Sequence, residues 1–117
     1  MTIILPERPT HQAAAELQTV DLEEIVLGEP GRPCVAADAN PDDWFPDEPG
    51  TGNQGCARSL YQALALQLCR GCPVAPECLE LTLRREGLGR GHGIAGGTAP
   101  WQRQQVKASR GWAVRRG

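Results

Sequence analysis

The clearest hydrophobic pattern lies in residues 55–69, where leucines recur every four positions, at Leu60, Leu64 and Leu68. This spacing predicts a helix with one apolar face that ends at Cys69. A second stretch, residues 73–86, places Leu79 and Leu83 four apart, with prolines near its start and glycines after its end. Early prolines and following glycines are typical helix boundaries. The pattern therefore predicts two helices joined by a short turn.

The flanking segments have weaker patterns. Residues 11–27 contain good helix formers with partly helical spacing, followed by glycines and prolines, so we expect a mobile helix or a disordered arm. Residues 89–98 hold five glycines, which indicates a tight turn. Thr98 is a suitable cap for a further helix through "WQRQQVKASR". We therefore expect an all-α fold, a small bundle of three to four short helices with a Gly-rich turn and flexible termini.

The length and composition limit how such a fold is stabilised. A chain of 117 residues with one Phe, one Tyr and three Trp has a small core, and small domains commonly need a disulfide or a metal. We find no apolar run long enough to span a membrane and no secretory signal, so we expect a cytoplasmic protein with no membrane partner. Disulfides are disfavoured in that compartment, and the odd number of cysteines, five, also favours metal binding.

The stretch "CRGCPVAPEC" places Cys69, Cys72 and Cys78 within ten residues. A closed thiolate site needs a fourth ligand, for which the candidates are Cys34, Cys56 and His92. Cys56 lies about 20 Å from Cys69 if the helix between them is continuous. We therefore favour Cys34 as the fourth ligand and interpret Cys56 as a free thiol. Zinc and an iron–sulfur cluster both accept four thiolates, so the spacing leaves the metal open.

The charge is distributed unevenly along the chain. Residues 1–50 hold eleven acidic residues against two arginines, whereas residues 84–117 hold eight basic residues against one glutamate. This asymmetry indicates an acidic arm and a basic tail able to meet nucleic acid, although two solvated termini would have the same composition.

Several motifs occur together in a familiar order. A remote Cys34 precedes "DWFP" (43–46), "CRGCPVAPECLELTL" (69–83) and "GIAGG" (93–97), and basic residues follow. Over about residues 33–110 the chain thus resembles the WhiB-like proteins, iron–sulfur transcription factors of actinobacteria and their phages. The resemblance implies a helical fold around a [4Fe–4S] cluster that is held by Cys34, Cys69, Cys72 and Cys78 and reacts with oxygen or nitric oxide in many members.

The resemblance also implies partners. Relatives bind region 4 of the primary sigma factor in RNA polymerase, and we expect a monomer that forms a heterodimer with sigma and contacts DNA through its tail. The expected sigma contacts are Trp44, Phe45, Ile94, Gly96, Gly97 and Trp101. The expected DNA contacts are Arg103, Lys107, Arg110, Arg115 and Arg116. The corresponding division is an acidic flexible arm (1–32), a cluster-binding domain (33–98) and a basic helix and tail (99–117).

One position departs from the family pattern. Ala95 stands where the turn of relatives carries a tryptophan, and we expect Trp101 to replace that aromatic anchor. Two alternative functions stay open. One is a zinc-stapled transcription adaptor without a redox role. The other is a disulfide reductase, in which the apo protein uses the Cys69–Cys72 pair, but the helix predicted before Cys69 differs from the strand that usually precedes such a pair. We therefore do not expect an enzyme.

Overall fold

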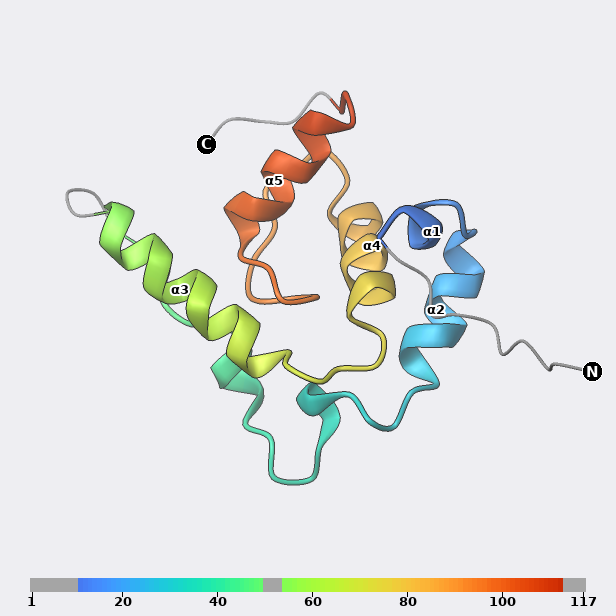
Figure 1. The fold of residues 1–117 in the computed structure, drawn as a ribbon, viewed down its shortest axis with the longest axis horizontal. Helices are drawn as coiled ribbons and strands as arrows, with labels where there is room; N and C mark the ends of the chain where they lie inside the picture. The colour runs from blue at the N-terminus through green and yellow to red at the C-terminus, as the bar shows by residue number, and fades with distance from the viewer. Residues whose placement is uncertain (1–10, 50–53, 113–117) are drawn as a thin grey trace, which may run out of the picture.

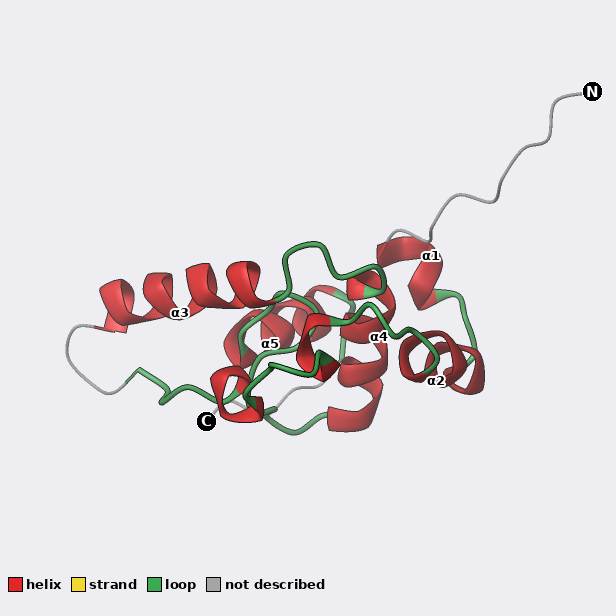
Figure 2. Cartoon of the chain, turned by 90° about the horizontal axis from the view of Figure 1, so that it is seen from below, coloured by secondary structure: helices red, strands yellow, loops and turns green. Residues whose placement is uncertain are grey.

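The computed structural model describes residues 11–49 and 54–112, which fold into helices and loops without a β-strand (Figures 1 and 2). The five α-helices are α1 (His11–Ala15), α2 (Thr19–Leu27), α3 (Gln54–Leu68), α4 (Ala75–Glu86) and α5 (Pro100–Ser109). Two short 3-10 helices, η1 (Pro33–Val35) and η2 (Pro41–Trp44), lie between α2 and α3. The predicted all-α class is confirmed. None of the described helices is long and apolar enough to cross a membrane.

The first two helices pack on α4 and form a small N-terminal core with it. The buried residues of this core are Ala14, Leu22, Val26 and Leu81. Arg84 of α4 also donates hydrogen bonds to the carbonyl of Ala15 and the hydroxyl of Thr19, both at 3.1 Å. Residues 11–27 are thus packed, whereas the sequence led us to expect a mobile helix or a disordered arm. Their pattern was weak because two helices, separated by the extended residue Gln18, each contribute only part of an apolar face.

A second core joins α3 to the glycine turn and α5. Its buried residues are Tyr61, Ala65, Ile94, Ala99 and Trp101. The rings of Tyr61 and Trp101 meet edge to face, with centroids 4.9 Å apart. The face of α3 in this core is therefore centred on Tyr61 and Ala65, and Leu60 from the predicted leucine stripe is 68% exposed.

Ion pairs hold α5 on α4. Glu86 accepts from Arg103 at 2.8 Å and from Lys107 at 2.9 Å, and both basic side chains are fully buried. Glu80, also buried, accepts from Arg110 at 2.6 Å and from Arg84 at 3.2 Å. The α4 helix consequently lies at the centre of the fold, with α1 and α2 on one side and α5 on the other (Figure 1).

Candidate metal centre and partner-binding surface

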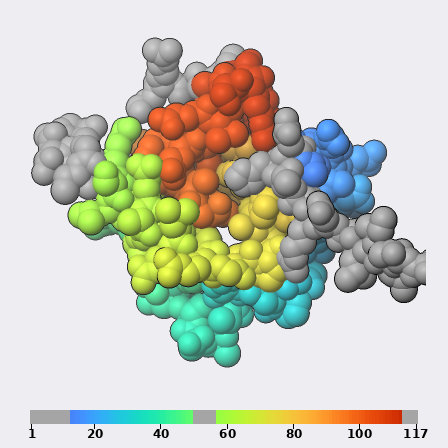
Figure 3. Space-filling view, in the orientation of Figure 1, coloured from blue at the N-terminus to red at the C-terminus, as the bar shows by residue number. Residues whose placement is uncertain are grey.

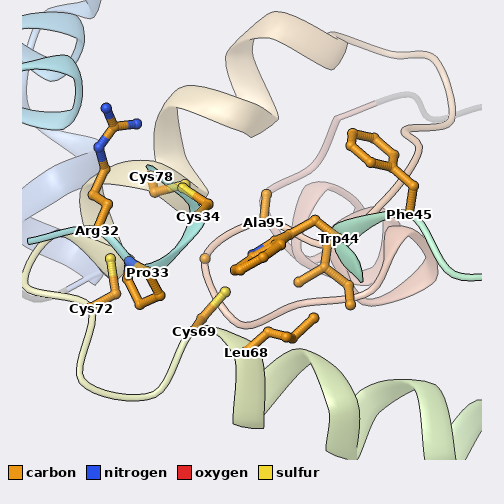
Figure 4. Close-up of a pocket in the computed structure, with 12 residues that line it drawn as sticks. Arg32, Pro33, Cys34, Trp44, Phe45, Leu68, Cys69, Cys72, Cys78 and Ala95 are labelled. Carbon is orange, nitrogen blue, oxygen red and sulfur yellow. The ribbon is translucent and has the colours of Figure 1, made fainter. Parts of the chain in front are cut away.

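Four cysteines line one pocket of about 200 Å³ (Figure 4). They come from different segments: Cys34 from η1, Cys69 from the end of α3, Cys72 from the following turn and Cys78 from α4. In the space-filling view the surface is hollowed between the segment that carries three of them and the glycine turn with α5 (Figure 3). The structure therefore brings together the four cysteines that the sequence analysis selected as ligands.

Local backbone geometry explains how these segments present their thiols. The amide of Cys69 closes the last turn of α3, and the chain reverses through Gly71, whose φ of +74° suits glycine. The amide of Cys72 then donates to the carbonyl of Cys69 at 3.1 Å, so both cysteines lie in one tight turn. Cys78 follows in the first turn of α4, where its amide donates to the carbonyl of Val74 at 2.8 Å.

Two of the pocket thiols, Cys69 and Cys78, have neighbours that favour the charged form. Burial raises the pKa of Cys69, and hydrogen bonds from the backbone of Gly97 and the side chain of Trp44 act in the opposite direction on that pKa. Burial likewise raises the pKa of Cys78, and a hydrogen bond from the Gly96 backbone opposes this rise. Donors aimed at sulfur stabilise a thiolate, which is the form that binds a metal.

The donor set fits a thiolate-bound group. All four candidate ligands are soft sulfur donors, and His92, the other candidate for the fourth ligand, does not line the pocket. The imidazole of His92 is mostly exposed and lies against the ring of Phe45, with centroids 5.5 Å apart. In the described part of the chain, no three Cys, His, Asp or Glu side chains are arranged to hold a metal ion, and the thiols surround a space instead. Cys56 lies on α3, but its side chain is outside the described part.

The glycine turn forms one wall of this pocket. Ala95 and Thr98 exchange backbone hydrogen bonds of 3.0 and 3.2 Å, which close a two-residue turn over Gly96 and Gly97. The turn is anchored to the aromatic segment, because the Ile94 amide donates to the Trp44 carbonyl at 2.7 Å. It also packs on the start of α4. A β-carbon at Gly96 would lie 2.7 Å from that of Leu79.

The predicted sigma contacts have different degrees of exposure. Phe45 is 55% exposed, and Trp44 is partly exposed beside it. Gly96 and Gly97 are partly exposed in the turn, whereas Ile94 is buried. Trp101 is also buried, because its ring packs on Tyr61 and under the guanidinium of Arg58, which lies 5.1 Å from the ring centroid. Trp101 therefore does not present the exposed aromatic ring that we expected it to supply in place of the tryptophan missing at position 95.

The predicted DNA contacts also separate into different groups. Arg103 and Lys107 are fully buried and paired with Glu86, so their charges are not accessible to DNA in this structure. Arg110 is exposed but pairs with Glu80. Arg115 and Arg116 lie outside the described residues. The structure thus revises the role expected of Arg103 and Lys107 from DNA contact to internal anchor.

Arg103 is the anchor of the glycine turn, a role that we did not predict from the sequence. It donates to the carbonyls of Gly93 and Thr98, at 2.8 and 2.9 Å, on both sides of the turn, as well as to Glu86. Lys107 adds a bond to the carbonyl of Gly89 at 3.1 Å. Arg103 and Lys107 lie four residues apart, hence on one helix face, and this spacing was the available signal. Their net charge alone indicated only a basic surface.

This geometry defines a class of small helical proteins that have a four-cysteine pocket beside a glycine turn. The family model described as Transcription factor WhiB matches residues 32–106. No curated protein matches the chain at a significant level, and no solved structure does. The match includes all four cysteines, the aromatic segment and most of α5. The chain belongs to the WhiB family of transcription factors.

Proposed function

We propose that this transcription factor is a redox-responsive iron–sulfur regulator. It binds region 4 of the primary sigma factor in RNA polymerase and contacts promoter DNA through its basic tail. The observation that carries the proposal is the convergence of four cysteines from separate segments on one pocket. Family membership supports a role in transcription, and the pocket chemistry supports the cofactor.

The pocket favours a [4Fe–4S] cluster over a zinc ion. A zinc ion needs its sulfur ligands about 2.3 Å from one point, whereas these thiols border a space of about 200 Å³. The N–H groups aimed at Cys69 and Cys78 are of the kind that tunes the potential of a cluster. Such a cluster, when bound, supplies the redox and gas-reactive centre. The thiolates of the four cysteines would hold it, and Trp44 and Ile94, which also line the pocket, would limit the access of water.

The surface beside the pocket supports binding to sigma. Phe45 offers an exposed aromatic ring, and aromatic rings are frequent anchors of protein interfaces. The glycine turn lies next to it, positioned by the Ile94–Trp44 hydrogen bond and by Arg103. A 1:1 complex with sigma region 4 is the expected assembly.

Anaerobic purification tests the cofactor. We expect a brown protein with iron and sulfide in equal amounts, about four of each per chain for a four-iron cluster. A colourless protein with one tightly bound zinc would contradict the proposal and favour the zinc-stapled adaptor. A pull-down with sigma region 4, run on the same sample, tests the partner. Loss of binding after cluster removal is the expected result.

The same sample, after its cluster has been removed, tests the disulfide-reductase alternative, which concerns the apo protein. A reductase needs an accessible thiolate, and the burial that raises the pKa of Cys69 works against it. We therefore expect no insulin reduction above that of the Cys69→Ser variant.

The basic tail is the proposed DNA contact. Each phosphate contact contributes close to one unit to the slope of log affinity against log salt concentration. Replacing both Arg115 and Arg116 by glutamine should therefore lower that slope by about 2. An unchanged slope would remove these two arginines from the DNA interface. The variant should keep the cluster spectrum of the unmodified protein.

A further inference from the structure

The side chain of Trp44 brings an N–H group to the wall of the cysteine pocket. Apart from the cysteines, the residues that line the pocket are apolar or glycine, with the exceptions of Trp44 and Arg32. Arg32 donates its Nε–H to the carbonyl of Glu29 at 3.1 Å, and Figure 4 shows its guanidinium extending away from the thiols. The indole of Trp44 extends toward the cysteines in the same view. Trp44 is therefore the lining residue whose side chain offers a donor to a thiolate.

The indole N–H donates to the sulfur of Cys69. Both residues pack against the core of α3, the glycine turn and α5, and both are partly buried, which limits competition from water. A donor at sulfur stabilises negative charge on the thiolate. One-electron reduction of a [4Fe–4S] cluster adds one negative charge to the group that the thiolates hold. The hydrogen bond therefore favours the reduced state and raises the reduction potential.

The backbone of Trp44 is tied to the proposed sigma surface. Its carbonyl accepts from the amide of Ile94 at 2.7 Å, which fixes it to the glycine turn. The next residue, Phe45, is 55% exposed, and its ring lies against the imidazole of His92 and leaves no room for a β-carbon at Gly93. A partner seated on Phe45 and the turn therefore restrains the backbone that carries the indole.

We propose that Trp44 is a positioning residue that sets the reduction potential of the cluster through Cys69 and makes this potential respond to a partner at Phe45. The reaction is a one-electron reduction by a low-potential electron donor. No bond forms or breaks, and the indole keeps its proton. A bound partner holds the N–H on the sulfur and so adds to the stability of the reduced state. The inference rests on the proposed function, because it requires both the cluster and the sigma factor.

Redox titration of cluster-loaded variants tests the hydrogen bond. Trp44→Phe keeps an aromatic ring but removes the N–H, so the equilibrium constant for reduction should fall about tenfold, which lowers the potential by about 59 mV. A role in packing alone predicts the opposite sign, because a smaller ring admits water and water stabilises the added charge. The matched control is Trp101→Phe. Trp101 lies in the adjoining core and does not line the pocket, so its replacement should leave the potential unchanged.

A second measurement uses the unmodified protein and does not require a variant to load its cluster. After reduction with dithionite, pulsed electron paramagnetic resonance should detect magnetic coupling between the cluster and an isotopically labelled indole nitrogen. The coupling should persist in Trp101→Phe, which assigns it to another tryptophan. Absence of the coupling in the unmodified protein would overturn the hydrogen bond.

Saturating sigma region 4 tests the response to the partner. The partner covers the pocket in both proteins, but only the unmodified protein has the N–H. The shift in potential caused by sigma should therefore be more positive in the unmodified protein than in Trp44→Phe. Equal shifts in the two proteins would show that Trp44 does not connect the cluster to the partner surface.

The outcomes separate this inference from the proposed function. If the protein carries zinc, both are wrong. If a cluster forms but sigma region 4 does not bind, the proposed partner is wrong and the response to it is wrong as well, whereas the potential of Trp44→Phe still decides the hydrogen bond. If the cluster and sigma behave as proposed and Trp44→Phe has an equal or higher potential than the unmodified protein, only the role of Trp44 is wrong.

Discussion

Gly96 and Gly97 are the residues through which the turn reaches the cysteines. Both have positive φ, +56° and +74°, and their backbones hydrogen-bond to Cys78 and Cys69. Gly96 has a second constraint, because a β-carbon there would lie 2.7 Å from Leu79 and 2.9 Å from the carbonyl of Ala75. The sequence "GIAGG" predicted a tight turn, but it did not reveal which element the turn packs against, since that depends on contacts distant in the sequence.

We therefore predict that Gly96→Ala lowers the thermal midpoint of the loaded protein by more than backbone strain explains. Strain at a left-handed position costs roughly 1–2 kcal/mol, and the contact with Leu79 adds to it. The matched control is Gly111→Ala. Gly111 also has a positive φ, +83°, but a β-carbon there meets nothing within 4 Å. Equal decreases in the two variants, measured by circular dichroism, would show that the turn does not pack tightly on α4.

Ala95 leaves the turn without an aromatic ring at its surface. Because Trp101 is buried between Tyr61 and Arg58, it does not replace that ring. We predict that Ala95→Trp tightens binding to sigma region 4 by about tenfold or more, since an aromatic anchor contributes roughly 2 kcal/mol at an interface. The affinity is measurable by fluorescence anisotropy with labelled sigma region 4. Ala95→Ser is the control, and tightening by serine as well would exclude an aromatic contact.

The helix α5 is an internal support as well as the route to the tail. Its helical span was predictable from Pro100 and the residues after it, but Ala99 and not the expected Thr98 is its N-cap, because the Thr98 hydroxyl donates to the Ala95 carbonyl in the turn. The burial of its charges was not predictable. Arg103 and Lys107 are polar in the pattern and buried in the fold, because Glu86 of α4 and the carbonyls of the turn satisfy them. Arg103 and Lys107 follow Glu86 by 17 and 21 positions, respectively, and contacts over such distances leave no periodic signal in the sequence.

We predict that Glu86→Gln destabilises the protein by about 3 kcal/mol or more, because two buried cations lose the charge that compensates them. A shift of the urea midpoint, followed by tryptophan fluorescence, measures this. The control is Glu23→Gln, which removes a carboxylate 4.0 Å from Arg85 on the exposed surface of α2 and α4. That pair is screened by water, so the midpoint should hardly change. Similar shifts in both variants would contradict the anchoring role.

At the scale of the described molecule, two small hydrophobic cores lie on either side of the cysteine pocket. Cys78 packs against the N-terminal core, and Cys69 packs against the core of α3, the turn and α5. The four candidate ligands could be chosen from the sequence because the length of the predicted helix separates Cys56 from Cys69. The two-core division could not, because the leucine pattern of α3 indicated a single stripe and Leu60 lies outside both cores.

Replacing any one of the four pocket cysteines by serine should abolish the visible spectrum and leave the chain largely unfolded. Small metal domains commonly fold only with their metal, and here the metal would also connect the two cores. Circular dichroism and iron content measure the two effects. Cys56→Ser is the control and should leave both unchanged. Iron loss in that variant, with normal loading in Cys34→Ser, would show that the wrong fourth ligand was chosen.

The position of the pocket between two cores has a thermodynamic consequence for signalling. A partner that contacts both Phe45 and the turn stabilises the arrangement in which the thiols face one another. If an intact pocket raises the affinity of the protein for such a partner by some factor, the partner raises the affinity of the pocket for its contents by the same factor. The two effects are equal because linkage is reciprocal. Under the proposed function, occupancy by sigma would set the threshold at which a chemical signal is registered. The same dose of oxidant would then have different effects on free and on polymerase-bound molecules.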